Sequence, residues 1–143
     1  MTIQFQRMNP EYIRQNHPRY YRDDITCFLI LKDFPLEDPV GVGLYGLIDH
    51  GIDPPTRGRQ AEAFLTLFPA FRYQVLGKGF FLSLFDHAFK SGFEVVYTWT
   101  RLTSWKKVFQ RFQSVGIHQL SYPPFWDNDL TKVWFAKEQK KEN

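Results

Sequence analysis

Residues 61–80 read AEAFLTLFPAFRYQVLGKGF, and this stretch carries the strongest structural signal in the chain. The β-forming and apolar residues of 61–68 predict a strand. The spacing Gln74-x-x-Gly77-x-Gly79 follows, and an amphipathic pattern begins at Gly79. Two glycines allow a tight backbone whose N–H groups converge on an anion at the positive end of a helix. The stretch therefore predicts a strand, an anion-binding loop and a helix, in that order.

The loop fits neither of two common nucleotide-binding patterns. Leu82 stands where a dinucleotide-binding fingerprint has its third glycine, and the Gly-Lys-Ser/Thr of a nucleotide P-loop is missing from the sequence. Taken alone, the two glycines are explained equally well by an ordinary turn followed by a helix start.

The other elements are predicted from periodicity and turn residues. We expect strands at residues 3–5, 25–31, 40–48, 95–100, 117–122 and 131–136, and helices after Asn9, from Gly79 to Ser91 and after Thr103 or Ser104. The glycines within 40–48 indicate that another backbone or a ligand approaches closely. The helix between strands 61–68 and 95–100 makes a parallel βαβ crossover. The predicted order is β-α-β-β-β-α-β-α-β-β, a mixed α/β fold with a central sheet and flanking helices.

Length and composition limit the class of protein. With 143 residues, 43% of them hydrophobic, we expect one domain over 1–143 with a frayed polar tail at 137–143. Cys27 is the single cysteine and no histidine has a companion at metal-ligand spacing, so neither an internal disulfide nor a metal site is expected. The sequence lacks an apolar stretch of membrane-spanning length and a signal-peptide core, which predicts a cytoplasmic protein.

The charge is concentrated in one part of the chain. The net charge is +3, while residues 72–111 carry seven basic and two acidic side chains. This segment favours an anionic ligand. A phosphate-bearing small molecule is expected before nucleic acid, because the sequence has no run of five basic residues and no recognisable nucleic-acid-binding motif.

The loop and its surroundings resemble a known family. Gln74-Val-Leu-Gly77-Lys-Gly79, between a strand and a helix-strand-helix-Gly116 series, is similar to the Gln/Arg-x-x-Gly-x-Gly/Ala motif of the GNAT superfamily of N-acetyltransferases. The likeness is closest over 62–117, and the element order extends it to the whole chain. It implies direct transfer of an acetyl group from acetyl-coenzyme A to a primary amine.

The resemblance also implies how acetyl-coenzyme A is held. The loop amides would bind its pyrophosphate, and strands 63–68 and 95–100 would part to admit its pantetheine arm. A backbone amide near Leu67 or Phe68 would polarise the acetyl carbonyl. The implied binding residues are Leu67, Phe68, Gln74, Val75, Leu76, Gly77, Lys78, Gly79 and Phe80.

An acylated amine must lose a proton, and the resemblance suggests a base. Glu62 stands at a position similar to that of a glutamate that some members use as base, usually through water. A strand-end carboxylate without a catalytic role explains Glu62 as well. Asp49 and His50, near the end of the preceding strand, are the runners-up.

The acid is harder to assign. Many family members carry a tyrosine that protonates the departing thiolate and an asparagine seven residues before it, but here those positions hold Phe112 and Trp105. Phenylalanine has no proton to give. Either water, Ser104 or Tyr97 supplies the proton, or catalysis is impaired, or the protein does not catalyse.

The alternative is therefore a non-catalytic adaptor or structural protein with the same fold. Small degenerate examples of the family occur among virion proteins of short-tailed phages, so the location would then be the virion and the partner a larger assembly or a second copy. The aromatic residues either fill the core or form an exposed partner surface; the candidates for that surface are Tyr20, Tyr21, Phe125, Trp126 and Trp134.

Overall fold

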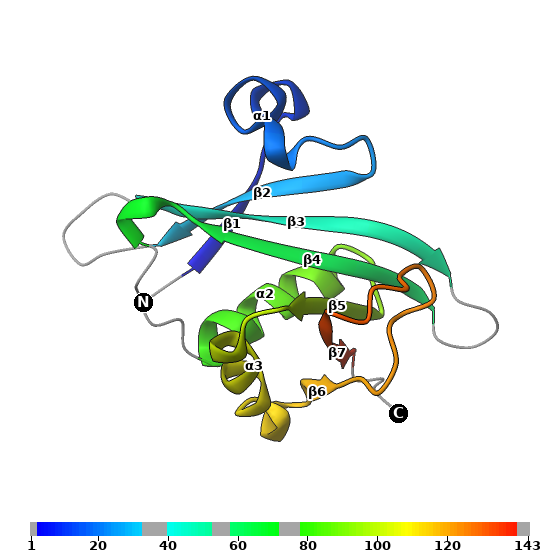
Figure 1. Ribbon diagram of the computed structural model, residues 1–143. Coiled ribbons are helices and arrows are strands. Elements are labelled where there is room, and N and C mark those ends of the chain that lie inside the picture. Colours follow the sequence, from blue (N-terminus) through cyan, green and yellow to red (C-terminus); the bar gives the residue numbers. More distant parts are fainter. Residues whose placement is uncertain (1–2, 33–39, 53–57, 72–77, 140–143) are drawn as a thin grey trace. The chain divides into compact units, whose positions relative to one another are not determined.

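The computed structural model describes residues 3–32, 40–52, 58–71 and 78–139 (Figure 1). The elements are β1 (Ile3–Arg7), α1 (Pro10–Asn16), β2 (Ile25–Lys32), β3 (Val40–Ile52), β4 (Arg59–Leu67), α2 (Lys78–Lys90), β5 (Val95–Thr100), α3 (Thr103–Gln110), β6 (His118–Gln119) and β7 (Val133–Glu138). Short 3₁₀ turns lie at Pro18–Tyr20, Pro69–Phe71 and Gln113–Val115. This order confirms the predicted mixed α/β fold.

The seven strands hydrogen-bond in the order β1-β2-β3-β4-β5-β7-β6. Strands β4 and β5 are parallel, and α2 connects them, as the crossover prediction requires. The chain divides into two compact units: unit 1 comprises residues 1–49 and 63–83, and unit 2 comprises residues 50–62 and 84–143. Strands β3 and β4 and helix α2 each contribute residues to both units.

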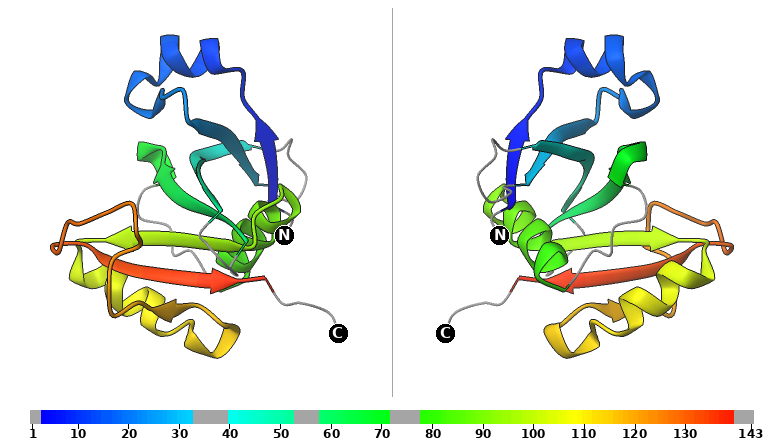
Figure 2. Two further views of the ribbon diagram at one scale, coloured as in Figure 1. Left: turned by 90° about the vertical axis from the view of Figure 1, so that its right-hand side faces the viewer. Right: turned by 90° about the vertical axis from the view of Figure 1, so that its left-hand side faces the viewer.

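Unit 1 is built on the antiparallel β1-β2-β3 ladder. Helix α1 follows directly after β1 (Figures 1 and 2), and its Ile13 packs with Cys27 of β2 and Leu44 of β3. The Asn9 side chain accepts a hydrogen bond from the Glu11 amide at the start of α1. The predicted helix start after Asn9 is confirmed.

A glycine in β3 allows close contact between strands of unit 1. A Cβ built on Gly43 would collide with the backbone carbonyl of Thr66 in β4, well inside any normal contact distance. The interpretation of the glycines in 40–48 as a site of close backbone approach is confirmed at this position.

The two faces of the sheet in unit 2 carry different side chains. Helix α3 lies along β5 and β6 (Figure 2), and its Phe109 packs on Phe135 of β7 with ring centroids 5.0 Å apart. Successive strand residues point to opposite faces, so Trp134 lies on the other face of β7. There it belongs to a buried cluster with Val95 and Tyr97 of β5. The face away from Phe109 is therefore rich in aromatic side chains.

Several predicted boundaries are wrong. Strand β3 was expected to end at Ile48, where its pairing with β2 stops, but it continues to Ile52 because β4 is its neighbour on the other side. Strand β6 contains two residues, whereas 117–122 were expected. It is short because its pairing with β7 is continued by only one further hydrogen bond, from the Leu120 N–H to the carbonyl of Trp134.

Two other expectations also need correction. Strand β7 extends to Glu138, two residues into the predicted frayed tail, and the Lys137 ammonium donates a hydrogen bond to the carbonyl of Val115. The N-cap of α3 is Leu102, not the expected Thr103 or Ser104, and its side chain makes no capping hydrogen bond. The hydroxyl of Thr100 accepts the N–H of Leu102 just before the helix begins.

Candidate functional site

A buried carboxylate on β4 is the centre of the site. Glu62 lies in unit 2, is 6% exposed, and uses both carboxylate oxygens as hydrogen-bond acceptors. Oε1 lies 3.0 Å from His50 Nε2 and accepts from Trp126 Nε1 at 3.2 Å. Oε2 accepts from Trp99 Nε1 at 2.8 Å. Three donors offset the cost of burying this charge.

Strand pairing and an aromatic stack position these donors. Glu62 is in register with Tyr97 of the parallel strand β5, and Trp99 follows two residues later on the same face. Trp126 comes from the connection between β6 and β7. Its indole stacks on the His50 imidazole with centroids 3.8 Å apart and planes 5° apart, and it meets the Tyr97 ring edge to face at 5.0 Å. The imidazole is thus fixed by a hydrogen bond and by a ring.

This geometry separates the roles of the two polar groups. An imidazole that donates to a carboxylate through Nε2 carries its lone pair on Nδ1 when it is neutral. The His50 side chain is 17% exposed and the Glu62 side chain 8%, so the imidazole is the more accessible group. The arrangement can accept a proton at His50 while Glu62 orients the ring and stabilises the resulting charge.

Two cationic side chains lie against the ring of Trp99. The Lys132 ammonium lies 4.4 Å and the Arg101 guanidinium 4.8 Å from its ring centroid. Arg101 also forms an ion pair with Asp129. Hydrogen bonds from the Thr131 hydroxyl and amide, together with the one from Arg101, hold the pKa of Asp129 well below its ordinary value. These contacts tie the chain before β7 to the end of β5.

The predicted loop residues Gln74, Val75, Leu76 and Gly77 lie outside the described part of the chain. Lys78 is the first residue of α2. Gly79, in the first turn of that helix, is exposed, and a Cβ built on it would meet nothing within 4 Å. Phe80 is 7% exposed. The proposed roles of these residues, and that of Leu67, stay predictions.

The backbone amide of Phe68, which was expected to polarise the acetyl carbonyl, already has a hydrogen-bond partner. It donates a 2.9 Å hydrogen bond to the carbonyl of Val42 inside unit 1. Since one N–H cannot serve two strong acceptors well, polarisation of a substrate carbonyl by this group would require the bond to Val42 to weaken.

The candidates for an acid lie in different surroundings. Ser104 is exposed in the first turn of α3, while Tyr97 is buried in the cluster with Trp134. Phe112 is also buried, and Trp105 packs partly buried against Phe109. Position 112 is therefore a packing position in this chain. Neither Ser104 nor Tyr97 is among the groups that contact Glu62 through an identified hydrogen bond in the described residues.

The prediction of an exposed aromatic surface is wrong in part. Trp134 is 2% exposed, because the rings of Trp99 on β5 and of Trp126 in the β6–β7 connection pack against it. Trp126 is itself partly buried against His50. Phe125 is 60% exposed, as expected. Tyr21 is partly buried against the Ile13 cluster in unit 1, and the side chain of Tyr20 lies outside the described part.

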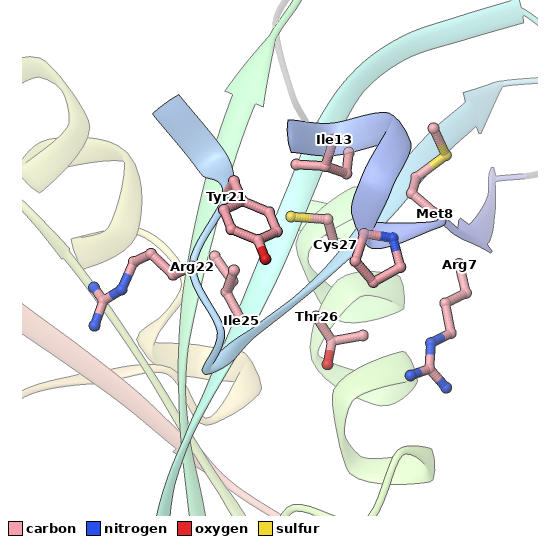
Figure 3. Close-up of a pocket in the computed structure, with 9 residues that line it drawn as sticks. Arg7, Met8, Ile13, Tyr21, Arg22, Ile25, Thr26 and Cys27 are labelled. Carbon is pink, nitrogen blue, oxygen red and sulfur yellow. The ribbon is translucent and has the colours of Figure 1, made fainter. Parts of the chain in front are cut away.

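A small cavity in unit 1 is too small for a substrate. It lies beside α1 and β2 and has a volume of about 40 Å³ (Figure 3). Ile13, Tyr21 and Cys27 line it, and Arg7 and Arg22 lie on opposite sides of it in this view. This volume is of the order of one water molecule. Burial raises the pKa of the Cys27 thiol.

Within the described residues there is neither a metal-binding cluster nor a membrane-spanning helix. No group of three or more His, Cys, Asp or Glu side chains there is arranged to hold a metal ion. No helix in residues 3–32, 40–52, 58–71 and 78–139 is long and apolar enough to cross a bilayer.

Neither of the two tryptophans that hold Glu62 was predicted to do so from the sequence. Trp99 could have been found, because the parallel crossover and the two-residue period of β5 place it on the face of Glu62. Trp126 had no such signal. It lies 64 residues from Glu62 in a connection without regular structure.

The chain has the fold of the GNAT N-acetyltransferases. Its strands follow the order β1-β2-β3-β4-β5-β7-β6, β4 and β5 are parallel, and β4 leads into the crossover helix. The predicted resemblance is confirmed for the fold. Paired residues of β4 and β5 run from Gln60 with Val95 to Glu62 with Tyr97, whereas β4 continues to Leu67.

Solved structures with this fold include three particular acetyltransferases. The IAA acetyltransferase of Bacillus cereus is 13% identical, with a TM-score of 0.58 over 96% of this chain and 100% of that one. Campylobacter jejuni N-acetyltransferase PseH, solved with acetyl coenzyme A, is 15% identical, with a TM-score of 0.55 over 97% and 100%. Mutant forms of the spermidine/spermine N-acetyltransferase SpeG of Vibrio cholerae are 11% identical, with a TM-score of 0.61 over 96% and 95%. The sequence matches no protein-family model and no curated protein.

Proposed function

We propose that this chain is an N-acetyltransferase that moves an acetyl group from acetyl-coenzyme A to a primary amine by direct transfer. The observation that carries the proposal is the buried His50–Glu62 pair on a fold shared with acetyltransferases. Acetyl-coenzyme A supplies the acetyl group as an activated thioester. One similar structure contains acetyl coenzyme A, and another is an enzyme named for spermidine and spermine, which are amines.

In this proposal His50 is the base. An amine attacks only through a free lone pair, so the proton it loses needs an acceptor close to the reacting nitrogen. Nδ1 of His50 takes that proton, and the Glu62 carboxylate stabilises the imidazolium that forms. Glu62 becomes a positioning residue in place of the base predicted from sequence. As the nitrogen–carbon bond forms, the carbon–sulfur bond breaks, and the departing sulfur takes a proton from Ser104, Tyr97 or water.

The first turn of α2 has features that support the proposed binding of acetyl-coenzyme A. The first amides of a helix have no intrahelical partner and carry partial positive charge. Gly79 is exposed there without a side chain, so an anion can approach the backbone. We propose that Gln74 to Phe80 hold the pyrophosphate, with Leu67 nearer the thioester.

The test is thiol release from acetyl-coenzyme A with a panel of primary amines, followed with a thiol reagent. His50→Gln should lower kcat by about 100-fold or more, since a positioned base contributes at least that much. His87→Gln is the matched control, because His87 lies on α2 and has no identified contact with Glu62. Comparing Tyr97→Phe with Ser104→Ala separates the two acid candidates. Equal rates for His50→Gln and the unchanged protein would refute the assignment.

The second candidate is a non-catalytic adaptor with the same fold. Buried Phe112, at the position where a tyrosine would supply a proton, favours it. An adaptor would show neither thiol release nor a thermal shift with acetyl-coenzyme A, and it would co-purify stoichiometrically with a larger assembly.

A further inference from the structure

A larger pocket lies in unit 2, and two of its lining residues, Gln60 and Tyr97, are neighbours of Glu62 in the sheet. Its volume is about 480 Å³, within the range of small-molecule sites, and its lining comes from β4, β5 and residues 118–125. A second hollow of about 200 Å³ shares residues 119–123 with it and is lined by Trp134 and Lys132. The two together surround the start of the β6–β7 connection.

Each hollow is lined by a buried side chain with an unpaired polar atom. Gln60 is 1% exposed and lines the larger pocket, and its Nε2 has no hydrogen-bond partner among the described residues. Trp134 is 2% exposed and lines the smaller one, where its Nε1 is likewise unpaired within that part of the chain. Since a buried donor without an acceptor costs free energy, both positions favour a ligand that brings oxygen atoms.

The larger pocket is linked to the proposed base through residues that surround Glu62. Gln60 and Glu62 are two residues apart on β4 and point to the same face of the sheet. Tyr97 lines the pocket, and its ring meets the indole of Trp126, which donates to Glu62 and stacks on His50. The ring of Trp126 therefore lies between Tyr97, in the wall of the pocket, and the imidazole of His50.

The lining combines aromatic rings with neutral polar groups, and His118 is the one histidine, acidic or basic side chain among its described residues. None of the described residues that line the larger pocket is Asp, Glu, Lys or Arg. Tyr97 forms part of the wall, and Tyr122 and Phe125 are 82% and 60% exposed at its edge. Rings offer flat apolar contact, whereas a chain with several ammonium groups would meet no carboxylate here to offset the loss of hydration.

We infer that this pocket binds the acceptor substrate, and that the acceptor is a primary amine on an uncharged ring-bearing molecule with an oxygen that accepts from Gln60, not a polyamine. The transfer step rests on the proposed function, but binding requires only the pocket. The inference narrows the substrate class to amines whose remaining groups are neutral.

The experiment measures binding of three probes by calorimetry without acetyl-coenzyme A. L-phenylalaninamide and 2-phenylethylamine share a ring and a primary amine, but only the first has a carbonyl oxygen; spermidine has the amines without the ring. L-phenylalaninamide should bind roughly 2- to 12-fold more tightly than 2-phenylethylamine, the worth of one hydrogen bond, and spermidine should bind most weakly. Gln60→Leu should abolish that difference, while Gln113→Leu, an exposed matched control, should keep it.

A second variant guards against misfolding of Gln60→Leu. Tyr122→Ser changes a side chain that is 82% exposed, so it should fold normally and weaken both aromatic probes. Tightest binding of spermidine, or an unchanged preference in a folded Gln60→Leu variant, would overturn the inference. Binding of L-phenylalaninamide without any acetyl transfer refutes the proposed function alone, whereas turnover of another amine without this binding refutes the pocket assignment alone.

Discussion

Replacing Glu62 by glutamine tests the centre of the site while keeping its shape. The carboxylate accepts three hydrogen bonds, two at Oε1 and one at Oε2. An amide has one oxygen. Its best orientation keeps that oxygen toward His50 and Trp126 and turns the NH₂ group toward the Trp99 indole N–H, so two donors then face one another.

The magnitude follows from that single mismatch. One charge-assisted hydrogen bond is lost, and a buried donor is left unpaired; a loss of this kind costs roughly 2 to 3 kcal/mol of unfolding free energy. For a domain of this length, that corresponds to a fall in Tm of about 10 °C. Because the negative partner of His50 is also removed, thiol release with acetyl-coenzyme A should fall in the same variant.

The assay is urea unfolding followed by far-ultraviolet circular dichroism, applied as a double-mutant cycle with Trp99→Phe. Phenylalanine removes the donor that faces the new NH₂ group. The double variant should therefore be about 1 to 2 kcal/mol more stable than the sum of the two single changes predicts. Glu138→Gln, an exposed position at the end of β7, is the matched control and should change stability by less than about 0.5 kcal/mol.

Additive effects within about 0.5 kcal/mol would show that the Glu62–Trp99 hydrogen bond does not determine the loss. Wild-type stability of Glu62→Gln would be a stronger contradiction, since it would mean that the carboxylate is not held by three donors.

Three further outcomes are expected from the described contacts. Gly43→Ala should lower the free energy of unfolding by about 1 to 3 kcal/mol in the same urea assay, because its methyl group meets the carbonyl opposite it on β4; an unchanged midpoint would contradict this. Native Cys27 should be alkylated far more slowly at pH 8 than a free thiol, and stability should fall as the pH rises above about 8.5, because burial raises its pKa; a free-thiol rate would refute this. The hydrogen bonds from Thr131 and Arg101 lower the pKa of Asp129, so their stabilisation is present above the unfolded value of about 3.9 and is lost as the pH falls below it; Asp129→Asn should flatten that acid loss in pH-dependent unfolding.

Much of the fold could be predicted from local patterns. The helix starts at Asn9-Pro10 and near Gly79, and the strand alternations around them, follow from steric and periodic preferences of neighbouring residues. The left-handed conformation of Gly116, φ 90°, also follows from its residue type. Boundaries that depend on distant partners, such as the end of β3 at Ile52, were not predicted, since pairing with another strand decides them.

The sequence by itself determined the order of the elements, because strand period, crossover and motif spacing are all written in neighbouring residues. Glu62 was singled out by the resemblance to a known family. Only the tertiary structure decided what Glu62 does. Its donors His50, Trp99 and Trp126 lie 12, 37 and 64 residues away. Strand period and crossover place only Trp99 on the face of Glu62, and they do not show which donors bind the carboxylate. A buried charge needs every one of its acceptor sites satisfied, and those partners come from whichever segments the sheet brings together.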